Sequence, residues 1–335
     1  MLNRCHLGDC RTLLRDFVTA GVRAQTCITS PPYWGLRDYG AAGQIGLEPT
    51  FEAWIASMVD VFRGVRDVLA DDGTLWVNMG DTYNAGTSAK RKAPKTGVDV
   101  GGWNDAEIDT GARVAFPGLK AKDMCGQPWR LAFALQADGW YLRQDIIWHK
   151  PNPMPETLTD RCTKAHEYLF LLSKQPRYFY DFEAMQEPVS GTANARGTGV
   201  NPKSQKMPDG WDTGSGAHGS FHRDGREKGK TRPRQNESFS GAVNELVEKR
   251  NRRSVWTIGT EGFEGAHFAT FPRALVEPCV LAGSRKGDVV LDPFMGSGTT
   301  AQVAEHLGRQ WIGCELQPDY LPLQQQRLAQ RAMAL

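Results

Sequence analysis

A proline-rich turn near the start of the chain carries residues that could hold a planar base. Residues 30–33 are Ser30, Pro31, Pro32 and Tyr33, and they follow an apolar, β-branched run at 25–28 that predicts a buried strand. Because neither proline has an N–H and each restricts the residue before it, the chain must turn rigidly where this strand ends. The turn would present the Ser30 hydroxyl and the Pro31 carbonyl as two acceptors beside the Tyr33 ring.

Two acceptors next to a ring suit a base that carries an exocyclic amino group. The lone pair of such a nitrogen is delocalised into the base. If the two protein acceptors bind both hydrogens of this amino group, its nitrogen becomes more pyramidal and able to attack an electrophilic methyl group. An ordinary Pro-Pro loop with a surface tyrosine is the alternative, and these residues alone leave it open.

A second motif, near the end of the chain, fits a cofactor that contains a nucleoside. Residues 292–301 read Asp-Pro-Phe-Met-Gly-Ser-Gly-Thr-Thr-Ala after a β-type run at 288–291, and we expect a helix to begin at the threonines. Glycines at such a turn let the backbone approach a nucleoside closely. Glu315, at the end of the next strand at 310–314, is placed to bind ribose hydroxyls.

The spacing of Gly296, Gly298 and Ala301 also fits a dinucleotide-binding oxidoreductase. Two features count against that alternative. Only about 35 residues follow Ala301, too few for the rest of a conventional dinucleotide fold. The strand followed by Asp-Pro-Phe is also foreign to the dinucleotide fingerprint.

Strand and helix patterns alternate along most of the chain, which predicts an α/β fold with a mainly parallel sheet and helices on both of its faces. Residues 51–69 have apolar side chains at helical spacing, and residues 71–73 are expected to end that helix. Asp9 follows the first strand and could accept hydrogen bonds from a ligand or cap a helix. The other expected elements are helices at 12–18, 128–137 and 272–281, and strands at 1–7, 74–79, 141–148 and 167–172.

Charge is concentrated in one irregular segment. The 335 residues have a formal net charge of +2, whereas residues 186–254 hold 13 Lys and Arg against 8 Asp and Glu, a balance of +5. Basic residues mixed with the aromatic side chains of Trp211 and Phe221 suit phosphate contacts and base stacking. A solvated insertion without a partner has the same composition. The candidate DNA-binding residues end this segment: Lys249, Arg250, Arg252 and Arg253.

Other features limit the class of protein. Apolar residues show no sustained periodicity in residues 84–118, which predicts a long loop there. The seven cysteines form no Cys-x-x-Cys pair, which argues against a zinc site and a disulfide framework, and His218 and His222 are expected to be unliganded. No apolar run approaches the length of a membrane span and no signal-peptide core is present. We therefore expect a soluble, cytoplasmic protein without a metal.

The two motifs, in this order, resemble the permuted (beta-type) amino DNA methyltransferases. In that family the catalytic half precedes the S-adenosylmethionine-binding half, and a target-recognition region lies between them. The resemblance covers most of the chain outside 84–118 and 186–254. It extends to intermediate landmarks: residues 73–78 (Gly-Thr-Leu-Trp-Val-Asn), 150–155 (Lys-Pro-Asn-Pro-Met-Pro), 166–168 (His-Glu-Tyr), and Phe271-Pro272 with Leu275.

The resemblance implies a Rossmann-like methyltransferase fold in circularly permuted order. The catalytic half would span residues 1–185, the target-recognition insertion 186–254 and the cofactor-binding half 255–335. The first strand would lie beside the strand at 310–314, and the strand at 288–291 beside the one at 25–28. Cofactor and base would then meet at the carboxyl ends of adjacent strands.

The resemblance also implies residue roles. S-adenosylmethionine would be the cofactor, with Asp292 near its methionine moiety, Glu315 on the ribose and Asp9 near the adenine. The residues implied to hold the flipped base are Ser30, Pro31, Pro32 and Tyr33. The residues implied to form the cofactor loop and a further wall of its pocket are Phe294, Gly296, Gly298, Thr299, Phe271 and Pro272.

The implied reaction is direct methyl transfer to a base flipped out of double-stranded DNA. Stacking on Tyr33 would return about 1–3 kcal/mol of the unstacking cost. Cytosine-C5 enzymes need a Cys nucleophile after a Pro, and the one such dipeptide here, Pro278-Cys279, lies in an apparent amphipathic helix, so Cys279 is assigned to the core.

Ser at the position of Ser30 goes mostly with cytosine N4 in this family, whereas Asp goes mostly with adenine N6. A hydroxyl is a poorer acceptor than a carboxylate and could also donate to a neighbouring ring atom. Cytosine N4 is therefore preferred and adenine N6 is the alternative. An RNA or protein amino-group methyltransferase and a catalytically silent DNA-binding protein stay open, as do a homodimer and a cognate restriction endonuclease as partners.

Overall fold

The computed structural model describes residues 1–38, 40–84, 118–157, 159–188, 249–261 and 271–329. The chain divides into two compact units, Met1–Met185 with Arg253–Leu335, and Gln186–Arg252. These limits lie close to the boundaries expected at 185 and 254. Residues 85–117, Trp211, Phe221, His218 and His222 are outside the described residues, so the expectations for them stay predictions.

The first unit is built on an eight-stranded sheet in the order β1-β10-β9-β2-β3-β5-β4-β8. The strands from β1 to β3 in this order are parallel, β5 runs antiparallel to β3 and β4, and β8 is parallel to β4. Their bounds are β1 Arg4–Leu7, β2 Ala24–Thr29, β3 Leu69–Met79, β4 Tyr141–His149, β5 His166–Ser173, β8 Val255–Thr257, β9 Val289–Asp292 and β10 Gln310–Glu315.

This sheet confirms the expected mainly parallel α/β class. β1 pairs with β10, and β9 pairs with β2, as the methyltransferase order predicts. Strand β8 was not expected from the sequence. The permuted order relative to other methyltransferases stays a prediction. In the second unit, β6 (Gln186–Pro188) and β7 (Lys249–Asn251) form an antiparallel pair.

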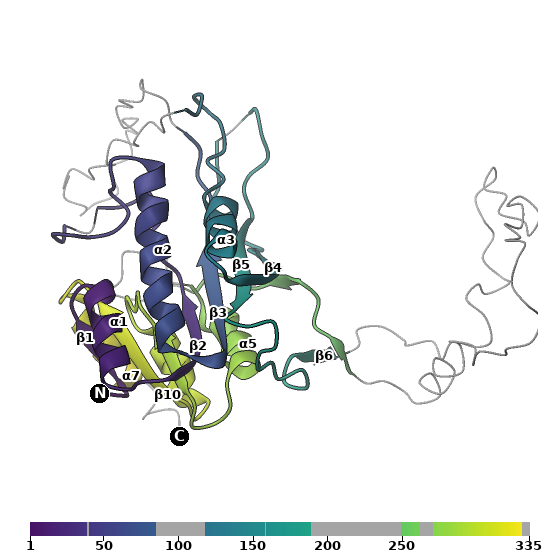
Figure 1. Ribbon diagram of the computed structural model, residues 1–335. Coiled ribbons are helices and arrows are strands. Elements are labelled where there is room, and N and C mark those ends of the chain that lie inside the picture. Colours follow the sequence, from purple (N-terminus) through teal and green to yellow (C-terminus); the bar gives the residue numbers. More distant parts are fainter. Residues whose placement is uncertain (39, 85–117, 158, 189–248, 262–270, 330–335) are drawn as a thin grey trace, which may run out of the picture. The chain divides into compact units, whose positions relative to one another are not determined.

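Helices cover both faces of the large sheet (Figure 1). Strand residues alternate between two buried apolar clusters, so that Leu75 and Val77 pack on one face and Trp76 on the other. Cys279 is fully buried, as expected. The helices over the first face are α1 (Cys10–Thr19), α2 (Phe51–Val68) and α3 (Gln127–Ala137), and those over the second are α5 (Arg273–Gly283), α6 (Thr299–His306) and α7 (Tyr320–Ala329).

One expected boundary is wrong. Residues 71–73 were expected to end the helix at 51–69, but α2 ends at Val68 and β3 already begins at Leu69. Leu69 has extended backbone angles and pairs with Ala24, and the register then shifts before Thr26. A Cβ at Gly73 would lie 2.9 Å from the Ala70 carbonyl oxygen. Gly73 therefore permits a close backbone approach inside β3, where the register shifts, and it does not end α2.

Two helices fix the proline-rich turn that follows β2. The Trp54 indole of α2 donates to the Pro32 carbonyl at 3.1 Å. The Gln127 side chain of α3 accepts from the Trp34 N–H at 3.1 Å and donates to the Trp34 carbonyl at 3.2 Å. Because Trp54 and Gln127 are fully buried, these bonds hold the backbone of the turn against the core.

Asp292 links the two motifs at the carboxyl ends of the central strands β9 and β2. Its carboxylate accepts from the Thr29 hydroxyl at 2.7 Å, the Thr300 hydroxyl at 2.7 Å and the Phe294 N–H at 3.0 Å. Thr29 ends β2, directly before Ser30, and Thr300 lies in the first turn of α6. Burial raises the pKa of Asp292 from 3.8 to about 6, although these donors oppose the shift.

Among the described residues, no helix is long and apolar enough to cross a membrane.

Asp292→Asn should change how stability depends on pH. A pKa of about 6 in the folded state against 3.8 without burial means that the folded protein binds the extra proton. The contribution of this group is therefore fully present below pH 3.8 and is lost as pH rises through about 6. As pH rises across this window, we expect the free energy of unfolding of Asp292→Asn to increase relative to that of the wild type by up to about 3 kcal/mol.

Urea unfolding at a series of pH values measures this difference. The matched control is Asp67→Asn on the exposed face of α2. Parallel pH curves for Asp292→Asn and the wild type would contradict the assignment.

Candidate active site

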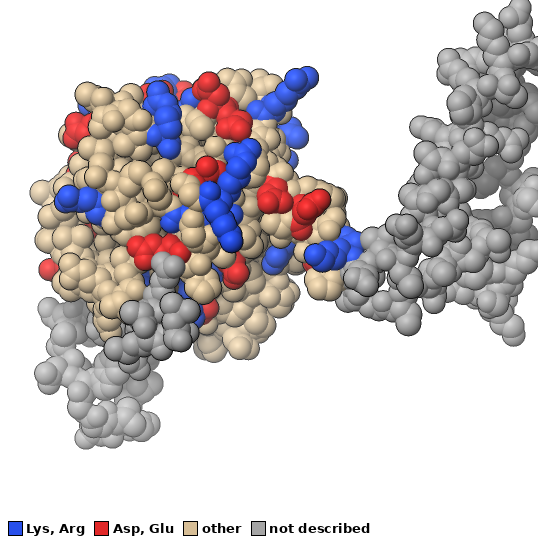
Figure 2. Space-filling view, turned by 90° about the horizontal axis from the view of Figure 1, so that it is seen from below, with Lys and Arg blue, Asp and Glu red and all other residues tan. Residues whose placement is uncertain are grey.

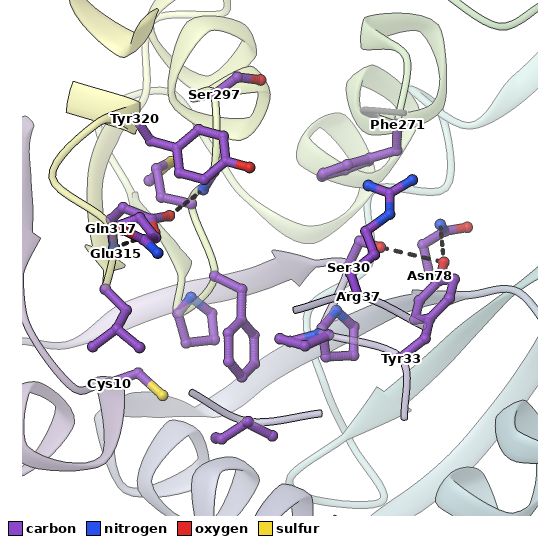
Figure 3. Close-up of a pocket in the computed structure, with 18 of the residues that line it drawn as sticks. Cys10, Ser30, Tyr33, Arg37, Asn78, Phe271, Ser297, Glu315, Gln317 and Tyr320 are labelled. Atoms are coloured by element: carbon purple, nitrogen blue, oxygen red, sulfur yellow. Dashed lines mark hydrogen bonds between the residues drawn. The ribbon is translucent and has the colours of Figure 1, made fainter. Parts of the chain in front are cut away.

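A cavity of about 340 Å³ opens at the carboxyl ends of β2, β9 and β10 (Figure 3). Ser30, Tyr33 and Asn78 lie on one side of it, and Glu315, Gln317 and Tyr320 lie on the other. The two motifs recognised in the sequence therefore face a shared space. The candidate residues that line it are Ser30, Pro31, Pro32, Tyr33, Asp9, Phe271, Phe294, Gly296, Thr299 and Glu315.

Three candidate cofactor residues do not line this cavity. Asp292 lies behind its wall, in the bonds to Thr29 and Thr300 described above. Pro272 is the N-cap residue of α5, and Gly298 is the N-cap residue of α6. The structure thus places these three residues outside the cavity lining, and a position of Asp292 near the methionine moiety of the cofactor stays a prediction.

Glu315 lies on the side of the cavity that the glycine-rich loop forms. Its two carboxylate oxygens accept from the Gly296 N–H and the Gln317 N–H, each at 2.8 Å. Only 9 % of the residue is exposed, and burial raises its pKa above the ordinary value while the backbone donors oppose the shift. Each oxygen keeps a further lone pair that could accept from a ligand hydroxyl.

The glycine-rich loop leaves room for a ligand beside Glu315. Gly296 has φ +52°, and a Cβ built there meets no atom closer than 4.0 Å. Gly298 has φ +86°, and its Cβ would lie 3.2 Å from the Gln324 side chain. Ser297 is among the residues that line the cavity, but its hydroxyl is buried and has no hydrogen-bond partner among the described residues.

Asp9 caps α1 and also lines the cavity, and a contact with a ligand stays a prediction. Its carboxylate accepts from the Arg11 N–H at 2.8 Å as the N-cap of α1. The Arg11 guanidinium also donates to it, and this bond lowers the pKa of Asp9 below the ordinary value. Asp9 therefore contributes a negative charge to the cavity lining.

The base side of the cavity includes three residues that were not selected as candidates. Asn78 is the second-last residue of β3 and lies beside Tyr33, Glu167 is the second residue of β5, and Lys150 forms an ion pair with Glu167. Burial and the Glu167 charge raise the pKa of Tyr33 well above its ordinary value. The signal for all three was present, because residues 73–78, 150–155 and 166–168 were the intermediate landmarks of the family resemblance.

The basic cluster has a mixed environment. Arg250 forms an ion pair with Glu187 at 2.8 Å, across the β6–β7 pair, whereas Lys249 is exposed. Arg253 belongs to the first unit, where its carbonyl accepts from the Trp256 indole. On the face shown in Figure 2, positive and negative side chains of the described residues are interspersed. Within the described part of the chain, no group of three or more His, Cys, Asp and Glu is arranged to hold a metal ion.

Comparison with known proteins identifies one family over most of the chain. Residues 24–326 match the model of a family described as DNA methylase. Type II methyltransferase M.SmaI of Serratia marcescens is 44 % identical over 310 residues, which cover 91 % of this chain and 84 % of that protein. Type II methyltransferase M.XycI of Xanthomonas campestris pv. cyanopsidis is 42 % identical over 325 residues, with coverage of 96 % and 86 %.

Solved structures share the fold. The PvuII DNA methyltransferase (cytosine-N4-specific) superposes with a TM-score of 0.56 at 17 % identity, covering 96 % of this chain and 85 % of that one. The M1.HpyAVI–SAM complex superposes with a TM-score of 0.52 at 15 % identity, covering 97 % and 98 %. The match of residues 24–326 and the relatives above 40 % identity show that this chain belongs to the DNA methylase family.

Proposed function

We propose that the chain is a site-specific DNA methyltransferase that transfers a methyl group from S-adenosylmethionine to the exocyclic amino group of a flipped base, with cytosine N4 preferred and adenine N6 as the alternative. One observation carries this proposal: the Ser30 turn and the Gly296–Glu315 wall line a single cavity at the ends of adjacent parallel strands. Ligands of open α/β sheets bind at such strand ends.

The cofactor side fits a nucleoside with ribose hydroxyls. Glu315 has lone pairs left after its two backbone bonds, and Gly296 leaves open space beside it. Phe271 and Phe294 add apolar walls to the same cavity. When bound, S-adenosylmethionine supplies an electrophilic sulfonium methyl group. Glu315 and the glycine-rich loop would hold and orient the cofactor.

The base side fits an amino group. Ser30 Oγ and the Pro31 carbonyl would accept the two amino hydrogens, and the Tyr33 ring would stack on the base. Trp54 and Gln127 hold the turn in place, because they bind the Pro32 carbonyl and the Trp34 N–H on either side of Tyr33. Catalysis is then mainly orientation of the amino nitrogen toward the methyl group, without a covalent enzyme intermediate.

The target is proposed to be duplex DNA. M.SmaI and M.XycI are Type II methyltransferases by name, and by analogy this chain would act at a specific sequence and accompany a restriction endonuclease. The preference for cytosine N4 rests on Ser30, because Ser at this position goes mostly with that base in the family. A cytoplasmic location agrees with a DNA substrate.

Nucleoside mass spectrometry of duplex DNA after incubation with the protein and S-adenosylmethionine tests the reaction and the base together. We expect N4-methylcytosine. N6-methyladenine alone would overturn the base preference but keep the amino-methyltransferase assignment. Methylation of RNA or protein, with unmodified DNA, would overturn the proposed function.

Glu315→Gln should weaken S-adenosylmethionine binding roughly ten- to hundredfold, because an amide replaces one charged acceptor with a donor. DNA binding should change less than about twofold, since Glu315 lies on the cofactor side. Calorimetry measures the first affinity and fluorescence anisotropy with labelled duplex the second. Glu52→Gln, on the exposed first turn of α2, is the matched control. Equal loss of both affinities in a folded variant would count against this site.

Neutralising Lys249, Arg252 and Arg253 together should weaken DNA binding and flatten its salt dependence. Each lost phosphate contact removes roughly 0.9 from the slope of log affinity against log salt. Arg250→Gln, which removes a single charge from the same cluster, is the comparison and should flatten the slope less. Affinity measured between low and moderate salt gives both slopes, and an unchanged slope for the triple variant would favour an insertion that does not contact DNA.

A further inference from the structure

The hydroxyl groups of Ser30 and Tyr33 belong to a hydrogen-bonded chain that ends on Glu167. Tyr33 Oη donates to Glu167 Oε2 at 3.1 Å. Ser30 Oγ lies 3.4 Å from Tyr33 Oη (Figure 3). Asn78 Nδ2 donates to the same Glu167 oxygen at 3.0 Å and lies 3.4 Å from Tyr33 Oη. Lys150 Nζ pairs with the other oxygen, Oε1.

The donors in this chain can be assigned by counting hydrogens. A carboxylate that faces a lysine ammonium can only accept, so Tyr33 must donate its single hydrogen to Glu167. Tyr33 Oη is then left with acceptor capacity only. Ser30 must therefore be the donor in its contact with Tyr33. Its hydrogen points toward Tyr33, and its lone pairs are left for the cavity.

Packing of the surrounding residues keeps the side chains of Ser30, Tyr33 and Glu167 in this arrangement. A Cβ at Gly80 would lie 3.2 Å from both Tyr33 Cε2 and Glu167 Cδ, so the absence of a side chain lets the ring and the carboxylate meet. Asn78 is 2 % exposed and contributes both of its donor contacts from the end of β3. The Lys150 ammonium also lies 4.4 Å from the centre of the Trp148 ring, which holds the cation beside Glu167.

We propose that Glu167 is a positioning residue that, through the Tyr33 hydroxyl, makes Ser30 Oγ a hydrogen-bond acceptor toward the target amino group. This inference rests on the proposed function. A carboxylate in place of Ser30 could only accept, but a hydroxyl can also donate, so a serine needs neighbours that fix its hydrogen. The same arrangement prevents Ser30 from donating to the ring nitrogen of the base, which removes that part of the sequence-based reason for cytosine.

Tyr33→Phe tests the chain without removing the stacking ring. The single-turnover rate of methyl transfer to duplex DNA should fall at least about tenfold, because Ser30 loses its fixed orientation. The dissociation constants for DNA and S-adenosylmethionine should stay within about threefold, since neither side of the cavity loses a contact. Tyr168→Phe, on the same strand as Glu167 but outside the cavity lining, is the matched control and should keep the wild-type rate.

Glu167→Gln should cause a similar loss of rate, because an amide can donate to Tyr33 and reverse the chain. If both residues act only through Ser30, the double variant Tyr33→Phe/Glu167→Gln should transfer the methyl group as fast as the slower of the two single variants. Losses that multiply, or a wild-type rate in either variant, would overturn the proposal. Should Tyr33→Phe fail to fold in a thermal melt, the rate of Glu167→Gln decides alone. Absence of methyl transfer by the wild type would instead reject the proposed function.

Discussion

The buried carboxylate of Asp292 joins the two halves of the site. It is the last residue of β9, and it binds the last residue of the neighbouring strand β2 and the first turn of α6. A buried carboxylate is costly unless donors surround it, and here two hydroxyls and one N–H do so. The start of the Ser30 turn and the start of the glycine-rich loop are thereby held at a fixed separation.

The two sides of the cavity are built by different means. On the cofactor side, Glu315 is held by backbone N–H groups, so its place follows from the ends of β10 and β9. On the base side, Tyr33 and Ser30 depend on side chains from β3, β5 and the residue after β4. A loop built on backbone bonds tolerates changes in sequence, whereas a side-chain network depends on each of its members.

The neutral hydroxyl at Ser30 explains why so many charged and polar groups gather behind Tyr33. A serine gives no direction of its own to its hydrogen. Glu167 gives that direction, and Lys150 and Asn78 together supply donors to a carboxylate that would otherwise be poorly paired. The antiparallel strand β5 brings Glu167 opposite the end of β3, so the one reversal of strand direction beside β3 serves the site.

The sequence by itself determined the α/β class, the positions of most helices and strands, and the two motifs that share the cavity. These features depend on local patterns: apolar periodicity, prolines without an N–H, and glycines at strand ends. The end of α2 could not be predicted in this way, because Leu69 is drawn into β3 by its pairing with Ala24. Only the tertiary structure decided that Asp292 lies behind the cavity wall and that Glu167 reaches Tyr33. Both depend on contacts between residues far apart in the chain, where the chemistry of a side chain is set by the neighbours that the fold brings to it.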